Sequence, residues 1–259
     1  MTLIFYSMQI NHFTINRATR DPRPLLFALL FLLAIFFSCD KSDDNPAHKI
    51  PRIKTITHGT SPNSDKEFYE YDSMGRVISI TITGHTPGHT QYVYLENKIV
   101  RMSDSFIQLD TLYLNNKGLV MREMFGSTTY EYDANGYCNH SIFYNSDGKI
   151  GMEYQSQVSD GNQTVLEIWE TFNKQLVHST TREYEFLPNS VNTIGEENKG
   201  ITFYGKQDKN LLSVETERNT GSESSDQRHY SYQIDAKNRV VKRWMDGYPE
   251  YGDVFTYYE

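Results

Sequence analysis

The chain has 259 residues, of which 25 are Lys or Arg and 33 are Asp or Glu, so its formal net charge at pH 7 is −8. Binding to a nucleic-acid backbone needs a basic face, so this acidic balance argues against nucleic acid as a partner. A chain of this length can bury a proper core, and we expect it to do so as one domain.

The N-terminus has the features of an export signal. Three arginines, Arg17, Arg20 and Arg23, precede the apolar run at residues 25–38, which is too short to span a bilayer comfortably. The run ends at Cys39, where the sequence becomes polar. This order resembles a bacterial lipoprotein signal, which implies that Cys39 is lipidated and becomes the first residue. The alternative is an ordinary cleaved signal in which the position of Cys39 is accidental.

The residues after Cys39 form a short acidic stretch, "DKSDDN". It resembles the tag that sends lipoproteins of Bacteroidota to the outer face of the outer membrane, and it also suits a solvated tether. We therefore divide the chain into a signal (1–38), a tether (39–50) and a β-domain (51–259). Removal of residues 1–38 takes away three Arg and one Asp, which leaves 22 basic and 32 acidic residues, or −10. Cys138 would then be the only Cys besides the lipidated one, so no intrachain disulfide is expected.

A short phrase recurs along the β-domain. "YEYDSMGRVIS" at residues 69–79 returns as "YEYDANGYCNH" at residues 130–140. Strict copies of the pattern are centred on four glycines, and looser copies are centred on Asn97, Asn210 and Asn238. The four central glycines are Gly75, Gly118, Gly136 and Gly148.

Each position of the phrase has a physical reason. An Asx residue three positions before the Gly, such as Asp72 or Asp133, is typical of a type I turn, and the Gly accepts a left-handed conformation. Apolar or aromatic residues six and four positions before the Gly share one face of a strand. The apolar residue two positions after it can meet them across the hairpin. Each copy therefore predicts one β-hairpin, with Asp72, Gly75, Gly118, Asp133, Gly136 and Gly148 as structural turn residues.

The segments between the copies are also rich in β-branched and aromatic residues, for example 76–83, 164–172 and 254–259. We count about sixteen to eighteen short strands at the spacing of all-β chains. The sequence predicts an all-β antiparallel meander of hairpin repeats that forms an extended, curved or rolled sheet. A closed tube, an open curved sheet and a sandwich would all give this pattern. Residues 195–200 and 219–227 are expected to be loops.

The phrase Y-x-Y-D-x-x-G-R resembles the tyrosine–aspartate (YD) repeats of the RHS family, most specifically at residues 69–77 and 130–136. The whole chain looks like the uncharacterised β-rich lipoproteins of Bacteroidota built from degenerate copies of that repeat. The resemblance implies an antiparallel β meander. RHS shells enclose toxins, but this chain is too short for that role and carries no toxin segment.

The candidate ligand residues have simpler structural readings. Tyr69, Tyr71, Tyr130 and Tyr132 are expected to pair on the inner face, although exposed tyrosines can also stack on sugars. Trp169 and Trp244 are expected in the core or at its rim, with a ligand platform as the alternative. His85 and His89 flank a Pro-Gly turn and need not converge on a metal. Asp72, Asp133 and Asp147 lie one per turn, without the dense spacing that calcium needs. Cys138 occupies an apolar position of its repeat.

No nucleophile, nucleotide or zinc motif occurs in the sequence. We therefore predict a protein that is not an enzyme and has no cofactor or metal. The predicted function is that of a lipid-anchored module with a binding or structural role at the outer membrane, facing the cell exterior, with a glycan or an envelope protein as partner. The alternatives are a secreted hydrolase acting on polysaccharide or peptide, and an accessory subunit of an outer-membrane assembly.

Overall fold

The computed structural model describes residues 50–259 apart from 62–63, 105–107 and 126. The predicted signal, Cys39 and all of the predicted tether except Ile50 lie outside the described residues. Sixteen strands and one short 3-10 helix occur in the described part of the chain. The strands are β1 (Ile53–His58), β2 (Lys66–Tyr71), β3 (Val77–Thr83), β4 (Gly88–Tyr94), β5 (Lys98–Ser103), β6 (Gln108–Leu114), β7 (Val120–Glu123), β8 (Thr128–Tyr132), β9 (Cys138–Tyr144), β10 (Ile150–Ser159), β11 (Asn162–Phe172), β12 (Gln175–Val191), β13 (Asn210–Asn219), β14 (Ser225–Ile234), β15 (Val240–Met245) and β16 (Asp253–Tyr257).

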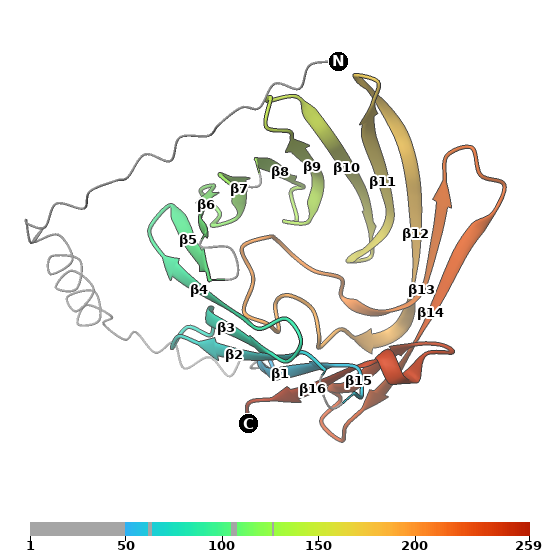
Figure 1. The fold of residues 1–259 in the computed structure, drawn as a ribbon. Helices are drawn as coiled ribbons and strands as arrows, with labels where there is room; N and C mark the ends of the chain where they lie inside the picture. Colours follow the sequence, from blue (N-terminus) through green and yellow to red (C-terminus); the bar gives the residue numbers. More distant parts are fainter. Residues whose placement is uncertain (1–49, 62–63, 105–107, 126) are drawn as a thin grey trace, which may run out of the picture. The chain divides into compact units, whose positions relative to one another are not determined.

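These strands form one closed barrel (Figure 1). Each strand pairs antiparallel with its neighbours in sequence, and β16 pairs with β1 to complete the ring, from Ile53 opposite Tyr257 to His58 opposite Asp253. The predicted all-β antiparallel meander is confirmed. The predicted extended, curved or rolled sheet is wrong, because the sheet closes on itself. Closure joins the first strand to the last, and no local sequence pattern specifies that pairing.

Successive strands run in opposite directions, so the turns that connect them lie alternately at the two ends of the barrel. The turns that follow β2, β6, β8 and β14 lie at one end, together with the start of β1 and the end of β16, and we call it the repeat end. The turns that follow β1, β3, β9, β11, β13 and β15 lie at the other end, which we call the mouth. The copies centred on Gly75, Gly118 and Gly136 lie at the repeat end, whereas the copy centred on Gly148 joins β9 to β10 at the mouth.

The four glycines of the repeat have a left-handed backbone, with φ between +74° and +91°. The N–H of each donates to the carbonyl of the Asx residue three positions earlier, over 2.8–3.1 Å. In the first copy, Asp72 Oδ1 also accepts hydrogen bonds from the backbone N–H groups of Met74 and Arg76, at 3.0 and 2.9 Å. In the third copy, Asp133 Oδ1 accepts from Tyr137 N–H at 2.9 Å. The Asx side chain therefore holds the turn that the glycine permits.

Residues 192–209, between β12 and β13, run into the barrel and return, and we call them the inner segment (Figure 1). Backbone N–H groups at the repeat end donate to its carbonyls: Ile53 to Asn198 at 3.0 Å, Val77 to Gly200 at 3.2 Å and Val120 to Phe203 at 2.7 Å. In return, the N–H groups of Lys206 and Lys209 donate to the carbonyls of Gly136 and Gly161, both at 2.9 Å. These contacts reach strands or turns around most of the ring, so the inner segment crosses the repeat end.

The core lies where the repeat end meets the inner segment. Ile201 and Phe203 of the inner segment belong to one apolar cluster with wall residues. The wall residues with the least exposure, 0–2%, are Ile53, Val77, Ile99, Leu112, Val120, Leu211 and Val240. Burial of each such side chain contributes about 1.5–3 kcal/mol, so this cluster stabilises the inner segment and the wall together.

Candidate functional site

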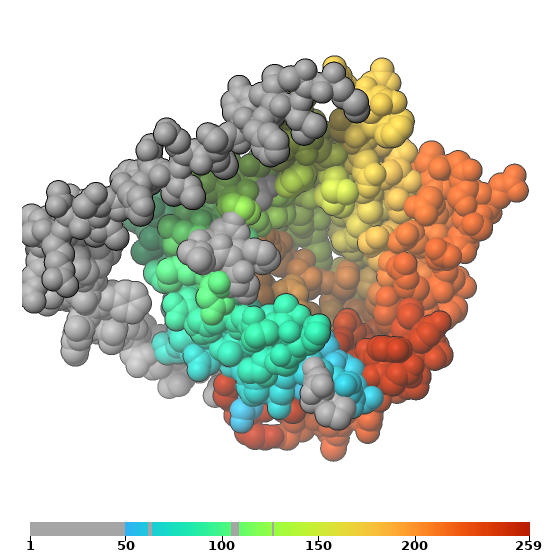
Figure 2. Space-filling model, in the orientation of Figure 1, coloured from blue at the N-terminus to red at the C-terminus, as the bar shows by residue number. Residues whose placement is uncertain are grey.

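The mouth opens into a hollow. Figure 2 shows this hollow in the face of the molecule, with orange atoms from the region around residue 200 at its depth. The register places charged and tyrosine side chains on the inner face of the wall above that floor, in three clusters described below. The interior is therefore polar near the mouth and apolar at the repeat end.

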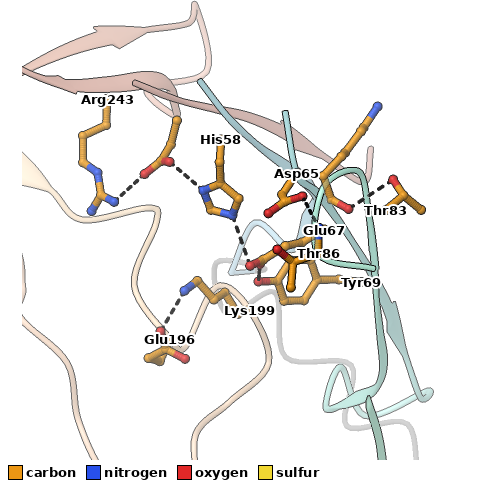
Figure 3. A network of polar contacts seen from close by, with 11 residues as sticks. His58, Asp65, Glu67, Tyr69, Thr83, Thr86, Glu196, Lys199 and Arg243 are labelled. Carbon is orange, nitrogen blue, oxygen red and sulfur yellow. Dashed lines mark hydrogen bonds and ion pairs between the residues drawn. The ribbon is translucent and has the colours of Figure 1, made fainter. Parts of the chain in front are cut away.

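The first cluster lies where the first and last strands meet, and Figure 3 shows His58 at its centre. His58 Nδ1 is 2.8 Å from Asp253 Oδ1, and Nε2 is 3.1 Å from Glu67 Oε1. Asp253 also pairs with Arg243, and the Tyr69 hydroxyl donates to Glu67. Burial alone would lower the pKa of His58, but the two hydrogen-bonded carboxylates outweigh it and raise the pKa above the ordinary 6.5.

The second cluster connects the wall to the inner segment. Arg101 Nη2 is 2.6 Å from Asp110 Oδ2 and 3.5 Å from Glu123 Oε2. Glu123 accepts hydrogen bonds from Tyr130 of the wall at 2.8 Å and from Tyr204 of the inner segment. Burial is the largest cause that raises the pKa of both tyrosines, and the contacts with Glu123 raise it further. Both hydroxyls therefore stay protonated and act as donors at neutral pH.

The third cluster is a ladder of alternating charges on the long strands β12, β13 and β14. Arg182 Nε is 2.9 Å from Glu217 Oε2, and Arg228 Nη1 is 2.9 Å from Glu215 Oε1. The Tyr230 hydroxyl donates to Glu215 Oε2 at 3.0 Å. Each charge in the ladder faces an opposite one, so this inner wall is hydrophilic without a large local excess of charge.

The charged groups of the first cluster are tightly paired with one another. The space between the carboxylates of Asp253 and Glu67 is filled by the His58 ring, which leaves no room for a substrate between them. Among the described residues, no group of three or more His, Cys, Asp or Glu is arranged to hold a metal ion. At the mouth, the paired charges place hydrogen-bond donors and acceptors side by side.

A pocket lies at the edge of the mouth, between β14, β15 and the loop that leads to β16, and we call it the rim pocket. Its lining includes Tyr230, Arg243, Trp244, Tyr248, Tyr251 and Asp253. The 3-10 helix η1 (Pro249–Tyr251) forms part of this loop. Tyr248 and Tyr251 are 51% and 74% exposed, so the pocket presents aromatic rings to solvent.

The tyrosines of the repeat lie on the inner face. Tyr69 is 3% exposed, and Tyr71 and Tyr130 pack against the core cluster. The sequence did not reveal the hydrogen-bond partners of the tyrosine hydroxyls. Five tyrosine hydroxyls donate to inward carbonyls of the wall over 2.5–2.8 Å: Tyr71 to Ile53, Tyr94 to Val77, Tyr132 to Val120, Tyr232 to Leu212 and Tyr257 to Val240.

The other candidate residues do not gather into a site. Trp169 lies on the outer face against His178, with ring centroids 5.1 Å apart, and Trp244 reaches the rim pocket. His89 Nδ1 lies 3.0 Å from Thr81 Oγ1 within the wall, whereas His85 lies in the preceding turn. Cys138 is half-buried, and burial raises the pKa of its thiol. Asp147 lies in the mouth turn and pairs with Lys149 at 2.7 Å.

Sequence reasoning missed the role of the inner segment. Residues 195–200 form a loop, as the sequence predicts, but the loop lies inside the barrel rather than on its surface. The sequence contains one indication of this role: Ile201, Phe203 and Tyr204 follow closely in the connection. Three large apolar or aromatic residues in close succession are unusual in a surface loop. A long connection with its own apolar group is typical of a segment that packs against a core.

Comparisons with known proteins identify the fold. No protein-family model and no curated protein sequence matches the chain. A crystal structure of a porin-like protein from Bacteroides uniformis ATCC 8492 is similar, with a TM-score of 0.58 and 16% identity over 80% of this chain and 98% of the other. Another porin-like protein, from Bacteroides vulgatus ATCC 8482, gives 0.55 and 13% over 80% and 99%. At this identity the likeness extends to the barrel fold alone. No helix among the described residues has the length and apolar character to cross a bilayer.

Proposed function

We propose that this protein is a non-enzymatic binding module: a barrel closed at its repeat end, open at its mouth, and held at the outer face of the bacterial outer membrane by a lipid on Cys39. It would belong with the β-rich lipoproteins that carry degenerate YD repeats. The observation that carries the proposal is the inner segment, whose backbone bonds to the repeat end from Ile53 to Gly161 turn the barrel into a cup.

The inner segment argues against a channel. Porin barrels of 16 to 18 strands leave an aqueous passage. Here the segment occupies the repeat end with buried Ile201 and Phe203 and with backbone hydrogen bonds to the wall. Opening a passage would break those bonds and expose the cluster, which is a large cost against the usual marginal stability of a domain.

The outer wall argues against insertion in the bilayer. Membrane barrels carry an outward apolar band about 25 Å tall, and Arg or Lys facing lipid at mid-depth costs about 2–4 kcal/mol. Glu131 lies between the inward Tyr130 and Tyr132, so it faces outward. From it, register-paired neighbours run across β8 to β13 as a polar belt: Glu131, His140, Gln155, Glu167, Thr181 and Arg218.

A second outward row, in which all residues but one are polar, lies on another part of the wall. Paired outward neighbours there run from β14 through β1 to β3 as Gln233, Lys242, Val254, Thr57, Lys66 and Thr83. Strands β1 to β9 have only four to seven residues. A membrane-spanning strand needs about 9–11 residues. Both features support a barrel that stands in water, tethered to the membrane rather than embedded in it.

The test separates the tether from the barrel. A protease recognition sequence inserted between residues 44 and 45 of the full chain allows the barrel to be cut from its anchor on intact membranes. We expect cleavage to release a folded barrel into the supernatant without detergent, and labelled palmitate to mark the wild type but not Cys39→Ala. A cut barrel that stays with carbonate-washed membranes, or one that conducts ions in planar bilayers, would refute the proposal.

An accessory role in an outer-membrane assembly is the second candidate. It is favoured by exposed apolar side chains around β6 and β7, where Leu109, Met124 and Phe125 are 61–65% exposed. Exposed apolar groups that lie together often mark a protein contact. Chemical cross-linking in intact cells, comparing wild type with Leu109→Ser/Met124→Ser, tests this candidate. A specific cross-linked partner that the double variant loses would support it.

A further inference from the structure

The rim pocket is built by a loop that returns closely against β15. Tyr248 N–H donates to Met245 O at 3.0 Å, and Gly252 N–H donates to Pro249 O at 3.4 Å. A Cβ at Gly252 would lie 2.6 Å from Arg243 O and 2.8 Å from Trp244 Cβ, so only glycine allows this approach. The loop therefore has a defined path, and it fixes Tyr248 and Tyr251 at the opening of the pocket.

The two tyrosines of this loop differ from those of the repeat. The repeat tyrosines bury their rings and bond to wall carbonyls, whereas no residue of η1 is buried. The rings of Tyr248 and Tyr251 lie 6.3 Å apart at 50° to each other. The two rings therefore form adjoining aromatic surfaces that are exposed to solvent. Most other tyrosines of the described chain are packed.

The two charged side chains that line the pocket compensate each other. Arg243 pairs with Asp253, and the same carboxylate accepts from His58. A guanidinium has five N–H donors, so Arg243 keeps donors beyond the one that Asp253 takes. Because Asp253 already neutralises Arg243, an anion would gain little electrostatic attraction in this pocket. An apolar ligand would have to remove water from the ion pair, which is unfavourable. A neutral molecule with many hydroxyl groups suits both the ion pair and the aromatic opening.

We propose that the rim pocket binds a neutral saccharide. The C–H face of a pyranose ring stacks on Tyr251 or Tyr248, and its neighbouring hydroxyls donate to Asp253 and accept from Arg243. The open mouth leaves space for the rest of a longer chain to leave the pocket. This inference rests on the proposed function, because it names the class of ligand for the binding module.

The experiment is affinity electrophoresis of the full chain in a non-denaturing detergent. Native gels contain α-glucan, β-glucan, mannan or xylan as neutral probes and polygalacturonate as the anionic probe. The variants are Tyr251→Ala and Tyr248→Ala, with Phe172→Ala as the matched control. Phe172 is 68% exposed at another turn of the mouth, so its removal takes away an exposed ring outside the pocket.

We expect at least one neutral polysaccharide to retard the wild type and the Phe172→Ala variant equally, with at least a tenfold weaker effect on Tyr251→Ala. The outcome that none of the neutral probes retards the wild type would overturn the inference. So would stronger retardation by polygalacturonate, or equal retardation of wild type and both tyrosine variants. Equal retardation would contradict the saccharide site in the rim pocket but not the proposed binding module. Ion conduction, or failure of the barrel to be released from its tether, would contradict the binding module itself.

Discussion

The two ends of the barrel are held by different kinds of contact. At the repeat end, backbone N–H groups of Ile53, Val77 and Val120 bond to the inner segment, and these three residues are fully buried. At the mouth, ion pairs such as that of His58 with Asp253, and exposed tyrosines, lie where the repeat end has its apolar core. This difference explains why most copies of the repeat lie at the repeat end. The same backbone arrangement recurs around that end, so the same sequence pattern recurs with it. The mouth has no such common arrangement, and its side chains vary.

The largest expected effect comes from filling the space between the inner segment and the repeat end. Gly200 has φ +73°, and a Cβ there would lie 2.7 Å from Val77 N and 2.9 Å from Gly75 O. Gly200→Val should therefore destabilise the barrel by about 3 kcal/mol or more, because overpacking adds to backbone strain. Urea unfolding followed by tryptophan fluorescence measures the change.

Gly221 at the mouth is the matched control. It has φ +83°, and a Cβ at this position would meet nothing within 4 Å, so Gly221→Val should cost only the backbone strain, about 1–2 kcal/mol. Equal losses at Gly200 and Gly221 would mean that the inner segment yields easily. The contrast between a packed closed end and an open mouth would then be wrong.

A smaller effect is expected at the turn of the third copy. Gly136 has φ +91° in open surroundings, and its carbonyl accepts from Lys206 of the inner segment at 2.9 Å. Gly136→Val should cost more than about 1 kcal/mol, since a β-branched residue resists positive φ. Gly136→Asn should cost less, because Asn tolerates the left-handed region. An unchanged melting temperature for Gly136→Val would contradict the turn geometry.

Loss of one tyrosine hydroxyl tests the bonds to the wall carbonyls. Tyr132→Phe removes the 2.7 Å hydrogen bond to Val120 O and should cost about 1 kcal/mol by urea unfolding. Tyr113→Phe is the control, because the Tyr113 hydroxyl has only a 3.9 Å contact with Met124 Sδ in an exposed setting. If both variants unfold at the same urea concentration as the wild type, the hydrogen bonds from the tyrosine hydroxyls to the wall carbonyls do not contribute to stability.

The sequence was informative wherever the chemistry is local. The Asx and Gly residues of the repeat identify chain reversals, and the spacing of Tyr69 and Tyr71 identifies one strand face, which is enough for an antiparallel meander. The copy at Gly148 shows the limit of this reasoning, because the same turn chemistry appears at the mouth, where no inner segment lies. Turn residues specify a reversal and do not specify the end of the barrel at which it occurs.

Long-range contacts account for the features that sequence patterns do not reveal. The bond from Val77 N to Gly200 O and the pairing of Ile53 with Tyr257 join residues far apart in the chain, with no spacing rule to indicate them. The rim pocket, by contrast, combines Tyr230, Arg243 and Tyr251 from the consecutive elements β14, β15 and the following loop. These residues are near neighbours in the chain, but the path of the loop that carries Tyr251 past β15 follows no spacing rule, so the pocket is recognised only once the fold is known.

The smallest expected effect is a pH dependence that originates at the mouth. The pKa of His58 is raised in the folded barrel, so the extra stability from its pairing with Asp253 and Glu67 is fully present below about pH 6.5. It is lost as pH rises through the folded pKa. The side chain is 42% exposed, so solvent screening should limit the effect to less than about 1 kcal/mol. Urea unfolding of wild type and His58→Gln at pH 6 and pH 8, where carboxylates stay ionised, isolates this contribution. The wild type should lose more stability than the variant on going to pH 8. Equal changes in the two proteins would show that the pairing of His58 contributes nothing measurable to the seam between β1 and β16.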